Sequence, residues 1–253
     1  MRKLVTAALV ALCAIGSAGA IINGEPDGNR HPYVVGLGFF NPDGTPGAFC
    51  TGTLVSPTVV VTAGHCTFRS PQAVVWNSPR AAAGPPQSVG IPVTHPDFNP
   101  ELTTPNTGDL GVVRLLVPIN LAQYGALPAA NTLDSYSSKK GQQEKGVTLV
   151  GYGLQSLEGP AFERMLGHAE IRNVNNAAMR GYGVQTSNSR GNGTGGSGTC
   201  QGDSGGPILL GDSNVVVAVN SYGKNANCVG NDYSYRTDTP AARAFLGQFV
   251  ALP

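Results

Sequence analysis

Short apolar and β-branched stretches recur along the chain, separated by clusters of glycine, proline, asparagine and aspartate. Stretches rich in valine, leucine, isoleucine and aromatic residues predict β-strands. They lie at residues 33–40, 53–62, 73–76, 110–117, 147–152, 165–174, 208–210 and 215–222. Turn-forming clusters such as residues 41–44 and 84–86 stand between them. The pattern predicts an all-β protein, built as a sandwich or as barrels.

Two stretches have a helical pattern, residues 175–181 and, at the C-terminal end, residues 240–251. The second has the clearer signals. Thr239 can serve as its N-cap, and Pro240 suits the first helical position because it lacks an N–H to satisfy. The apolar side chains then lie roughly on one face: Ala244, Phe245, Phe249 and Leu252. We expect this face to pack on the body of the protein.

Residues 1–20 have the pattern of a secretory signal peptide. Arg2 and Lys3 supply the positive start, residues 4–15 the apolar middle, and residues 18–20 a small-residue cleavage site. The alternative is a membrane anchor, but the apolar run is much shorter than the about 20 residues that span a bilayer. We therefore expect a secreted protein. The polar run at 131–145 predicts a surface linker that divides the mature chain into residues 21–133 and 134–253.

Composition limits the kinds of partner. The chain has 253 residues, of which 41% are hydrophobic, so it can bury sizeable cores. Only 12% are charged and the formal net charge is +1, which gives no electrostatic case for binding nucleic acid or an anionic membrane. Recognition must instead depend on shape and pockets, and we expect no cofactor.

Four cysteines remain once the signal peptide and Cys13 are removed: Cys50, Cys66, Cys200 and Cys228. An even count in an exported chain predicts two disulfides. Three pairings are possible, and the local one joins Cys50 to Cys66 and Cys200 to Cys228. Each local bond would contribute about 3 kcal/mol by chain entropy. A zinc site is the alternative, but no C-x-x-C pair or histidine cluster accompanies these cysteines.

The strongest chemical signal is a serine among glycines, Gly202-Asp203-Ser204-Gly205-Gly206, just before an apolar run. A serine nucleophile needs a nearby base, and its reaction needs backbone N–H groups to stabilise an oxyanion. Glycines would let the chain turn tightly enough to aim the N–H groups of Gly202 and Ser204 at one point. The alternative is a glycine-rich surface turn.

His65 is the best candidate for the base. It follows a β-branched run and precedes Cys66, whose disulfide would hold the imidazole in place. By contrast, His31 and His95 precede prolines in turn-like loops, and His168 lies in a predicted strand. A lone histidine is usually structural, so a catalytic role requires a third group that orients the ring.

Asp109 is the best candidate for that third group. It opens the apolar strand 110–117 and can be buried against the imidazole, whereas Asp97 and Glu101 lie in a loop expected to be solvated. The alternative is a strand-start cap or a salt-bridge partner of Arg114.

Four motifs now stand in order: Ile-Ile-Asn-Gly at 21–24, Thr-Ala-Gly-His-Cys at 62–66, Asp-Leu at 109–110 and Gly-Asp-Ser-Gly-Gly-Pro at 202–207. Their order and separation resemble those of the chymotrypsin and trypsin serine proteases, over essentially all of residues 21–253. The resemblance implies two packed six-stranded antiparallel Greek-key barrels with a C-terminal helix. Residues 21–133 would form the barrel that carries His65 and Asp109, and residues 134–253 the barrel that carries Ser204 and the specificity pocket.

The resemblance also implies a mechanism. Ser204 would attack a peptide carbonyl, His65 would take and return the proton, and Asp109 would orient His65. The N–H groups of Gly202 and Ser204 would form the oxyanion hole. The expected partners are protein or peptide substrates and protein protease inhibitors, and the expected state is a secreted monomer.

In this family the carboxylate that Asp203 matches receives a freed N-terminal ammonium, here that of Ile21. Relatives usually expose this terminus by cutting after Arg or Lys, but no basic residue lies between Lys3 and Arg30. We therefore expect signal peptidase, cutting after Ala20, to create the active terminus directly. Cleavage after Ala18 with later loss of two residues is the alternative.

By the same resemblance, Ser221, Tyr222 and Gly223 form the edge strand that pairs with the substrate backbone. Gly223 would leave the pocket entrance open. Gly198, six positions before the nucleophile, would lie at the pocket base.

An Arg or Lys side chain would find no counter-charge at Gly198, and burying an unpaired cation is costly. We therefore expect cleavage after apolar residues. Tyr233 or Ser234 could face inward on the opposite wall, and a tyrosine there would shorten the pocket towards Ala and Val.

Two other classes of protein are alternatives to an active protease of this family. A catalytically silent binding protein of the same fold would typically have lost a triad residue, but His65, Asp109 and Ser204 are all present. An α/β-hydrolase esterase would need its catalytic histidine after the serine in the chain, and no histidine follows Ser204. Asn192 is a candidate glycosylation site in a glycine-rich loop.

Overall fold

The computed structural model describes residues 21–102, 106–136, 146–154, 162–175, 177, 179–187, 196–224, 228 and 230–253. The predicted signal peptide and Asn192 lie outside the described residues, as does most of the predicted linker. Six strands form a closed antiparallel barrel in the order β2-β3-β4-β7-β6-β5. They are β2 (Val34–Phe40), β3 (Pro46–Ser56), β4 (Val59–Thr62), β5 (Ala73–Trp76), β6 (Ser88–Thr94) and β7 (Gly111–Leu115).

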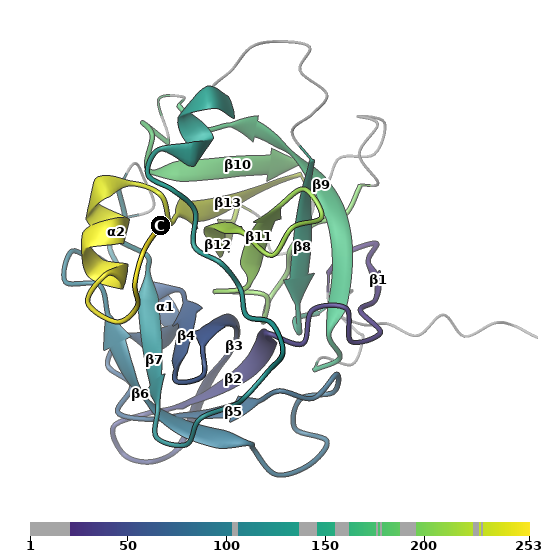
Figure 1. Ribbon diagram of the computed structural model, residues 1–253, viewed down its shortest axis with the longest axis vertical. Helices are drawn as coiled ribbons and strands as arrows, with labels where there is room; N and C mark the ends of the chain where they lie inside the picture. Colours follow the sequence, from purple (N-terminus) through teal and green to yellow (C-terminus); the bar gives the residue numbers. More distant parts are fainter. Residues whose placement is uncertain are drawn as a thin grey trace, which may run out of the picture.

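A second barrel repeats this order. Its strands run β9-β10-β13-β12-β11-β8, and β8 closes the ring by pairing with β9 (Figure 1). They are β8 (Gly146–Gly151), β9 (Met165–Asn173), β10 (Gly183–Ser187), β11 (Pro207–Leu210), β12 (Val216–Gly223) and β13 (Asn231–Arg236). The predicted pair of six-stranded Greek-key barrels is therefore confirmed, although no sequence repeat relates the halves.

The predicted strand 53–62 is wrong as a single element. Pro57 and Thr58 form a tight turn, so β3 ends at Ser56 and β4 begins at Val59, and the two strands pair with each other. The hairpin folds the β-branched run back on itself. Val60 and Val61 are neighbours in β4 and point to opposite faces of the sheet, and both are fully buried.

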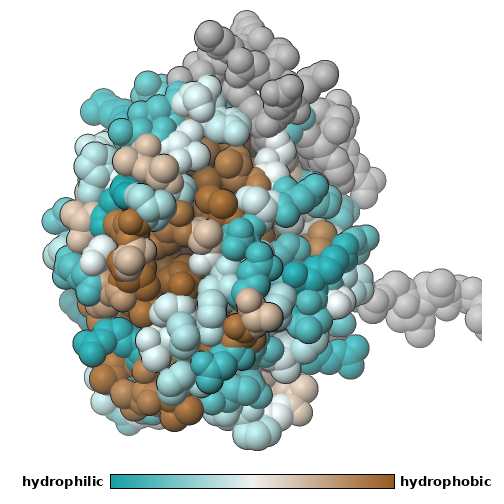
Figure 2. Space-filling model, viewed as in Figure 1, coloured by the Kyte–Doolittle hydropathy of each residue, from teal (hydrophilic) through white to brown (hydrophobic). Residues whose placement is uncertain are grey.

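Segments from each predicted half pack on the other barrel. The short strand β1 (Glu25–Pro26) adds to β9 of the second barrel. Helix α2 (Pro240–Leu246) packs instead on the core cluster of the first barrel, where the Phe245 ring lies 4.9 Å from the His95 ring. On the face that carries α2, apolar and polar surface alternate (Figure 2). The division at residues 133 and 134 remains a prediction.

Helix α2 begins as predicted and ends earlier. The Thr239 hydroxyl accepts a hydrogen bond from the Ala242 N–H, and Pro240 opens the helix. The helix stops before Gly247, a residue of low helix propensity, whereas the prediction extended it to residue 251. Phe249 and Leu252 still pack against the core beyond the helix. No helix in the described part of the chain is long and apolar enough to cross a membrane.

Candidate active site

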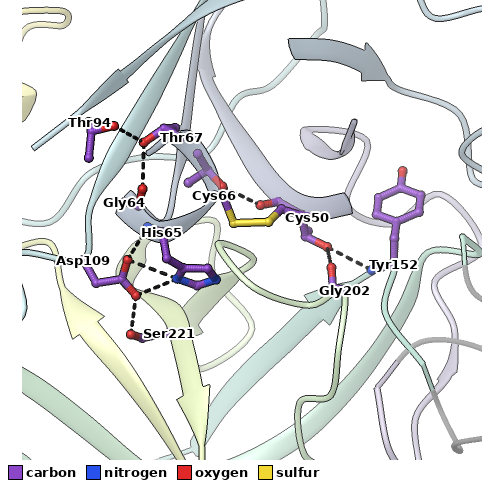
Figure 3. The surroundings of a disulfide bond; sticks show 12 residues. Cys50, Gly64, His65, Cys66, Thr67, Thr94, Asp109, Tyr152, Gly202 and Ser221 are labelled. Carbon is purple, nitrogen blue, oxygen red and sulfur yellow. Dashed lines mark hydrogen bonds and ion pairs between the residues drawn. A yellow bond between two sulfur atoms is a disulfide. The ribbon is translucent and has the colours of Figure 1, made fainter. Parts of the chain in front are cut away.

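The short helix α1 (Gly64–Thr67) places His65 beside Asp109, at the mouth of the first barrel (Figure 3). The backbone N–H of His65 donates to Asp109 Oδ1 at 2.7 Å, and His65 Nδ1 lies 2.9 Å from Asp109 Oδ2. Two contacts from one residue fix both the position and the tilt of the ring. With its Nδ1 proton on the Asp109 side, the ring presents Nε2 as an acceptor.

Asp109 is almost completely buried, and a third donor reaches it from the second barrel. Its side chain is 5% exposed, against 36% for the His65 side chain. The Ser221 hydroxyl of β12 donates to Asp109 Oδ2. Burial acts to raise the pKa of Asp109, but its bonds and charge interaction with His65 and the Ser221 hydroxyl outweigh burial and lower this pKa. The carboxylate is therefore held ionised.

The pKa of His65 moves in the opposite direction. Burial acts to lower it, and the hydrogen bond and negative charge of Asp109 raise it by more. The net effect is a pKa above the ordinary 6.5, so the ring is a stronger base than a free imidazole.

Both disulfides of the local pairing are present, joining Cys50 to Cys66 and Cys200 to Cys228. The first holds α1 against β3, next to His65. The ligand atoms of Cys50, Cys66 and His65 lie within 4.8 Å of one another. Both sulfurs are bonded to each other, however, so this group lacks the thiolates that a zinc site requires.

The loop that carries Ser204 needs its glycines. Gly202 and Gly205 have φ values of 93° and 76°, in the region that L side chains rarely adopt. A Cβ on Gly205 would overlap the Thr62 hydroxyl, and one on Gly202 would lie 2.8 Å from the Gly153 Cα. The serine is thereby brought against the first barrel.

This conformation leaves two donors open. Within the described part of the chain, the N–H groups of Gly202 and Ser204 donate to no protein acceptor. Nor does a hydrogen bond join the Ser204 hydroxyl to His65 among the described residues. In unliganded serine hydrolases such contacts are often long and tighten on substrate binding.

Thr51 joins the serine loop to the histidine side of the site, and the sequence analysis missed it. Its backbone N–H donates to the Ser204 carbonyl at 2.8 Å, and its hydroxyl donates to the Gly202 carbonyl at 2.9 Å. The same hydroxyl accepts from the Tyr152 N–H at 3.1 Å. Because Thr51 follows the disulfide-bonded Cys50, its position next to that cysteine was the one available signal.

Asp203 points away from the pocket into the second barrel. Its carboxylate accepts hydrogen bonds from the N–H groups of Cys200, Gly153 and Ile21. Burial raises the pKa of Asp203 to about 7 despite these bonds, and the nearby Asp232 raises it further. Ile21 is fully buried beside it. An anion in this position would be stabilised by a cation at the Ile21 nitrogen.

The family model described as Trypsin matches residues 21–245. This chain belongs to the trypsin family of serine-type endopeptidases. A trypsin from Saccharopolyspora erythraea is 32% identical over 211 residues, covering 81% of this chain and 87% of that protein. Brachyurin from Leptuca pugilator is 31% identical over 187 residues, covering 71% and 78%.

Solved structures share the fold of this trypsin-family chain. A collagenase structure described as HL collagenase superposes with a TM-score of 0.73 at 20% identity, covering 90% of this chain and 97% of the other. A structure described as GrC superposes with a TM-score of 0.67 at 18% identity, covering 90% and 98%. At these identities the likeness concerns the arrangement of the barrels.

A pocket of about 340 Å³ opens beside Ser204 in this trypsin-family chain. Its described lining comes from the loop before Ser204, the strand β12 and the second disulfide: Thr199, Cys200, Gln201, Ser204, Asn220, Ser221, Tyr222, Gly223, Lys224 and Cys228. The predicted edge residues 221–223 thus lie on its wall. A neighbouring, more apolar hollow of about 280 Å³ lies on the other side of Tyr222, lined by residues that include His65, Phe98 and Leu102.

The remaining predicted pocket residues lie behind this lining. Gly198 forms a bridge with Ile22, and its neighbour Thr199 reaches the pocket. The Tyr233 ring stacks on the Tyr222 ring with centroids 4.9 Å apart, outside the described lining of the larger pocket. Ser234 is also buried there, with its hydroxyl unpaired among the described residues.

Asp232 was missed by the sequence analysis. It lies in β13, is 3% exposed, and accepts a hydrogen bond from the Thr199 N–H at 2.8 Å. Burial raises its pKa to about 6. A single carboxylate in a polar stretch carries no sequence signal, so only the register that pairs Asp232 with Gly223 reveals its place.

Proposed function

We propose that this chain is a secreted endopeptidase that cleaves peptide bonds through an acyl-enzyme formed on Ser204. The observation that carries the proposal is the buried carboxylate of Asp109, which is bonded to both the backbone and the ring of His65. This arrangement sets the imidazole as a base. The predicted signal peptide and the two disulfides support an extracellular location.

In the proposed reaction the Ser204 oxygen attacks the substrate carbonyl carbon while its proton passes to His65 Nε2. The resulting imidazolium is stabilised by Asp109, which stays ionised. His65 then gives the proton to the leaving amine, and the acyl group remains on Ser204. Water, deprotonated by His65, attacks this ester, and His65 returns the proton to the Ser204 oxygen as the acid is released.

The two open N–H groups of Gly202 and Ser204 are the proposed oxyanion donors. Their partner would be the carbonyl oxygen as it becomes negatively charged. Loss of one such donor typically costs about 2.7–4 kcal/mol of barrier. Two donors held by a rigid glycine loop need no reorganisation during the reaction.

We propose that Ile21 becomes the N-terminus of the active protein and that its ammonium pairs with Asp203. The buried position of both residues supports this pairing. An ammonium would lower the pKa of Asp203 from about 7 and keep the carboxylate ionised. Signal peptidase would produce this terminus directly, so no zymogen would be stored.

The pocket is proposed to prefer apolar substrate side chains. Lys224 on its wall disfavours a second cation. Asp232, which accepts a hydrogen bond from the lining residue Thr199, is penalised by burial when charged. Cleavage after Arg or Lys would instead assign Asp232 the counter-charge.

The test uses secreted protein of known N-terminus, a peptide library with every residue type before the cleaved bond, and a fluorophosphonate probe. Wild type should label and cleave after apolar residues, and Ser204→Ala should do neither. Edman sequencing should give Ile21 as the first residue of active protein. A properly folded wild type that neither labels nor cleaves would favour a binding protein and contradict the proposal.

A further inference from the structure

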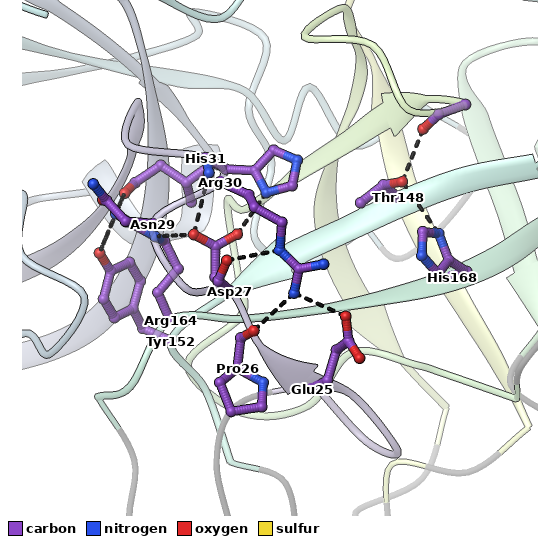
Figure 4. Close-up of polar contacts among 12 residues, drawn as sticks. Glu25, Pro26, Asp27, Asn29, Arg30, His31, Thr148, Tyr152, Arg164 and His168 are labelled. Carbon is purple, nitrogen blue, oxygen red and sulfur yellow. Dashed lines mark hydrogen bonds and ion pairs between the residues drawn. The ribbon is translucent and has the colours of Figure 1, made fainter.

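The largest fully buried side chain described in this protein is that of Arg164, just before β9. Its Nε donates to Asp27 Oδ2 at 2.9 Å, and both side chains are 0% exposed. Asp27 belongs to the N-terminal segment, 137 residues earlier in the chain. Figure 4 shows this carboxylate between the guanidinium of Arg164 and the ring of His31. We call Asp27 and Arg164 the buried clasp.

Arg164 holds the N-terminal segment at three separate points. Besides Asp27, its Nη2 donates to Asn29 Oδ1 at 2.5 Å, and its Nη1 donates to the Val34 carbonyl at 2.9 Å. Nη1 also lies 3.1 Å from the Tyr152 hydroxyl. The Asp27 N–H in turn donates to the Arg164 carbonyl at 3.0 Å. One guanidinium therefore contacts the segment between β1 and the start of β2 at Asp27, Asn29 and Val34.

The clasp lies close to the proposed N-terminus along a shared strand. Next to Arg164, the first two residues of β9 pair with β1, in the register Pro26 with Met165 and Glu25 with Leu166. Gly167 follows, and a Cβ built on it would lie 2.8 Å from Ile21 Cγ2. Strand β9 thus pairs with β1 at Met165 and Leu166 and lies next to Ile21 at Gly167.

The ladder between β1 and β9 is too short to set this register securely. It has two residue pairs, and both residues of β1 are exposed. Register is weakly specified in strands that bury no apolar side chains. A buried ion pair has one low-energy arrangement, because any slip would leave both charges without partners. The clasp adds specificity to this ladder, beside the bridge that joins Ile22 to Gly198 closer to Ile21.

We propose that Asp27 and Arg164 are positioning residues that hold Ile21 at Asp203, and so keep the serine loop in its active conformation. This inference rests on the proposed function, in which the Ile21 ammonium pairs with Asp203. The clasp touches neither substrate nor reacting atoms. It acts through the register of β1 on β9.

The proposal predicts a particular pH effect. At alkaline pH the Ile21 ammonium loses its proton and leaves Asp203, so activity falls. The pH at which half of the activity is lost, the alkaline midpoint, lies above the pKa of a free α-amino group, which is about 8. The difference is the base-ten logarithm of the equilibrium constant for docking the Ile21 ammonium at Asp203. A tenfold weaker docking therefore lowers the midpoint by about one pH unit.

Different charged and titratable groups surround Ile21 and the buried clasp. Asp203 accepts a hydrogen bond from the Ile21 nitrogen, and Asp232 acts on the Asp203 carboxylate. At the clasp, Asp27 faces Arg164, His31 and Tyr33, and Tyr152 faces Arg164. Asp27→Asn removes one charge from the groups around the clasp and leaves the groups around Ile21 unchanged. Its effect on the alkaline midpoint therefore has to pass through the position of Ile21.

The experiment measures docking directly by cyanate labelling of the α-amino group at pH 8, followed by mass spectrometry of the N-terminal peptide. Only an undocked amine reacts. We expect Asp27→Asn to label about tenfold faster than wild type and to lower the alkaline midpoint of kcat/KM by about one pH unit. The milder Asn29→Gly removes one acceptor from Arg164 and should label about threefold faster. It carries the test if Asp27→Asn does not fold.

Asp238→Asn is the matched control. Asp238 is fully buried and pairs with the buried Arg236 at 2.8 Å, but this pair lies beside α2. Its replacement should lower the melting temperature without changing the labelling rate or the alkaline midpoint. If Asp27→Asn behaves like this control in active protein, the positioning role is overturned. A wild type that hydrolyses no peptide overturns the proposed function as well.

Discussion

Thr51→Val tests whether one buried hydroxyl connects the serine loop to the rest of the site. Valine has nearly the same shape as threonine, so no cavity forms. The change removes the donor to the Gly202 carbonyl and the acceptor for the Tyr152 N–H, and Thr51 is fully buried. The Tyr152 N–H is then left buried without a partner, and the Gly202 carbonyl is left partly buried without one.

The magnitude follows from those two groups. An unsatisfied buried donor or acceptor costs about 1–3 kcal/mol, so the free energy of unfolding should fall by roughly 2–4 kcal/mol. In a protein of this size each kcal/mol shifts the melting temperature by about 2–4 °C. A fall of about 10 °C is therefore expected. Because the Gly202 carbonyl is released, kcat should also fall by about tenfold, less than the about 10²–10³-fold loss of a whole oxyanion donor.

The control is Thr53→Val, on the same face of the same strand. Thr53 is also fully buried, but its hydroxyl has no hydrogen-bond partner among the described residues. Removing it should leave stability unchanged or raise it by about 1 kcal/mol. Calorimetry and peptide hydrolysis on the two variants give the comparison. Equal melting temperatures would refute the assignment of the Thr51 bonds as supports of the loop.

Two further predictions concern the catalytic groups. Asp109→Asn should lower kcat by about 10⁴-fold, as expected for loss of the orienting carboxylate in this type of site. Catalysis needs neutral His65, so the acid midpoint of kcat/KM in the wild type should lie above pH 6.5. In Asp109→Asn only burial acts on the pKa of His65, so the acid midpoint should move below pH 6.5. A midpoint that stays in place would contradict the assigned pairing. Gly202→Ala should lose about 10²-fold in kcat. Gly181→Ala carries the same backbone strain, with φ of 81° but nothing within 4 Å of the added Cβ, and should keep full activity.

Alternation and composition predicted most strands but not β1, β6, β10 or β13, and for β13 the cause is plain. Strand β13 contains Asp232, Ser234 and Arg236, all buried although polar. Their burial is compensated by partners elsewhere in the chain, such as Asp238 for Arg236 and the Thr199 N–H for Asp232. Hydrophobic alternation in a sequence indicates a strand only when the buried positions are apolar. It therefore cannot recognise a strand whose buried positions are polar.

The sequence alone determined most strands of the two barrels, the candidate residues and their chemistry, because glycine placement, β-branched runs and motif order are local properties. Only the tertiary structure decided which side chains meet. Ser221 bonds to Asp109 across 112 residues, and Arg164 reaches Asp27 across 137. Such pairs form because closing two barrels buries polar groups, and each buried group must find a partner wherever the chain brings one. Nothing in the local sequence records that partner.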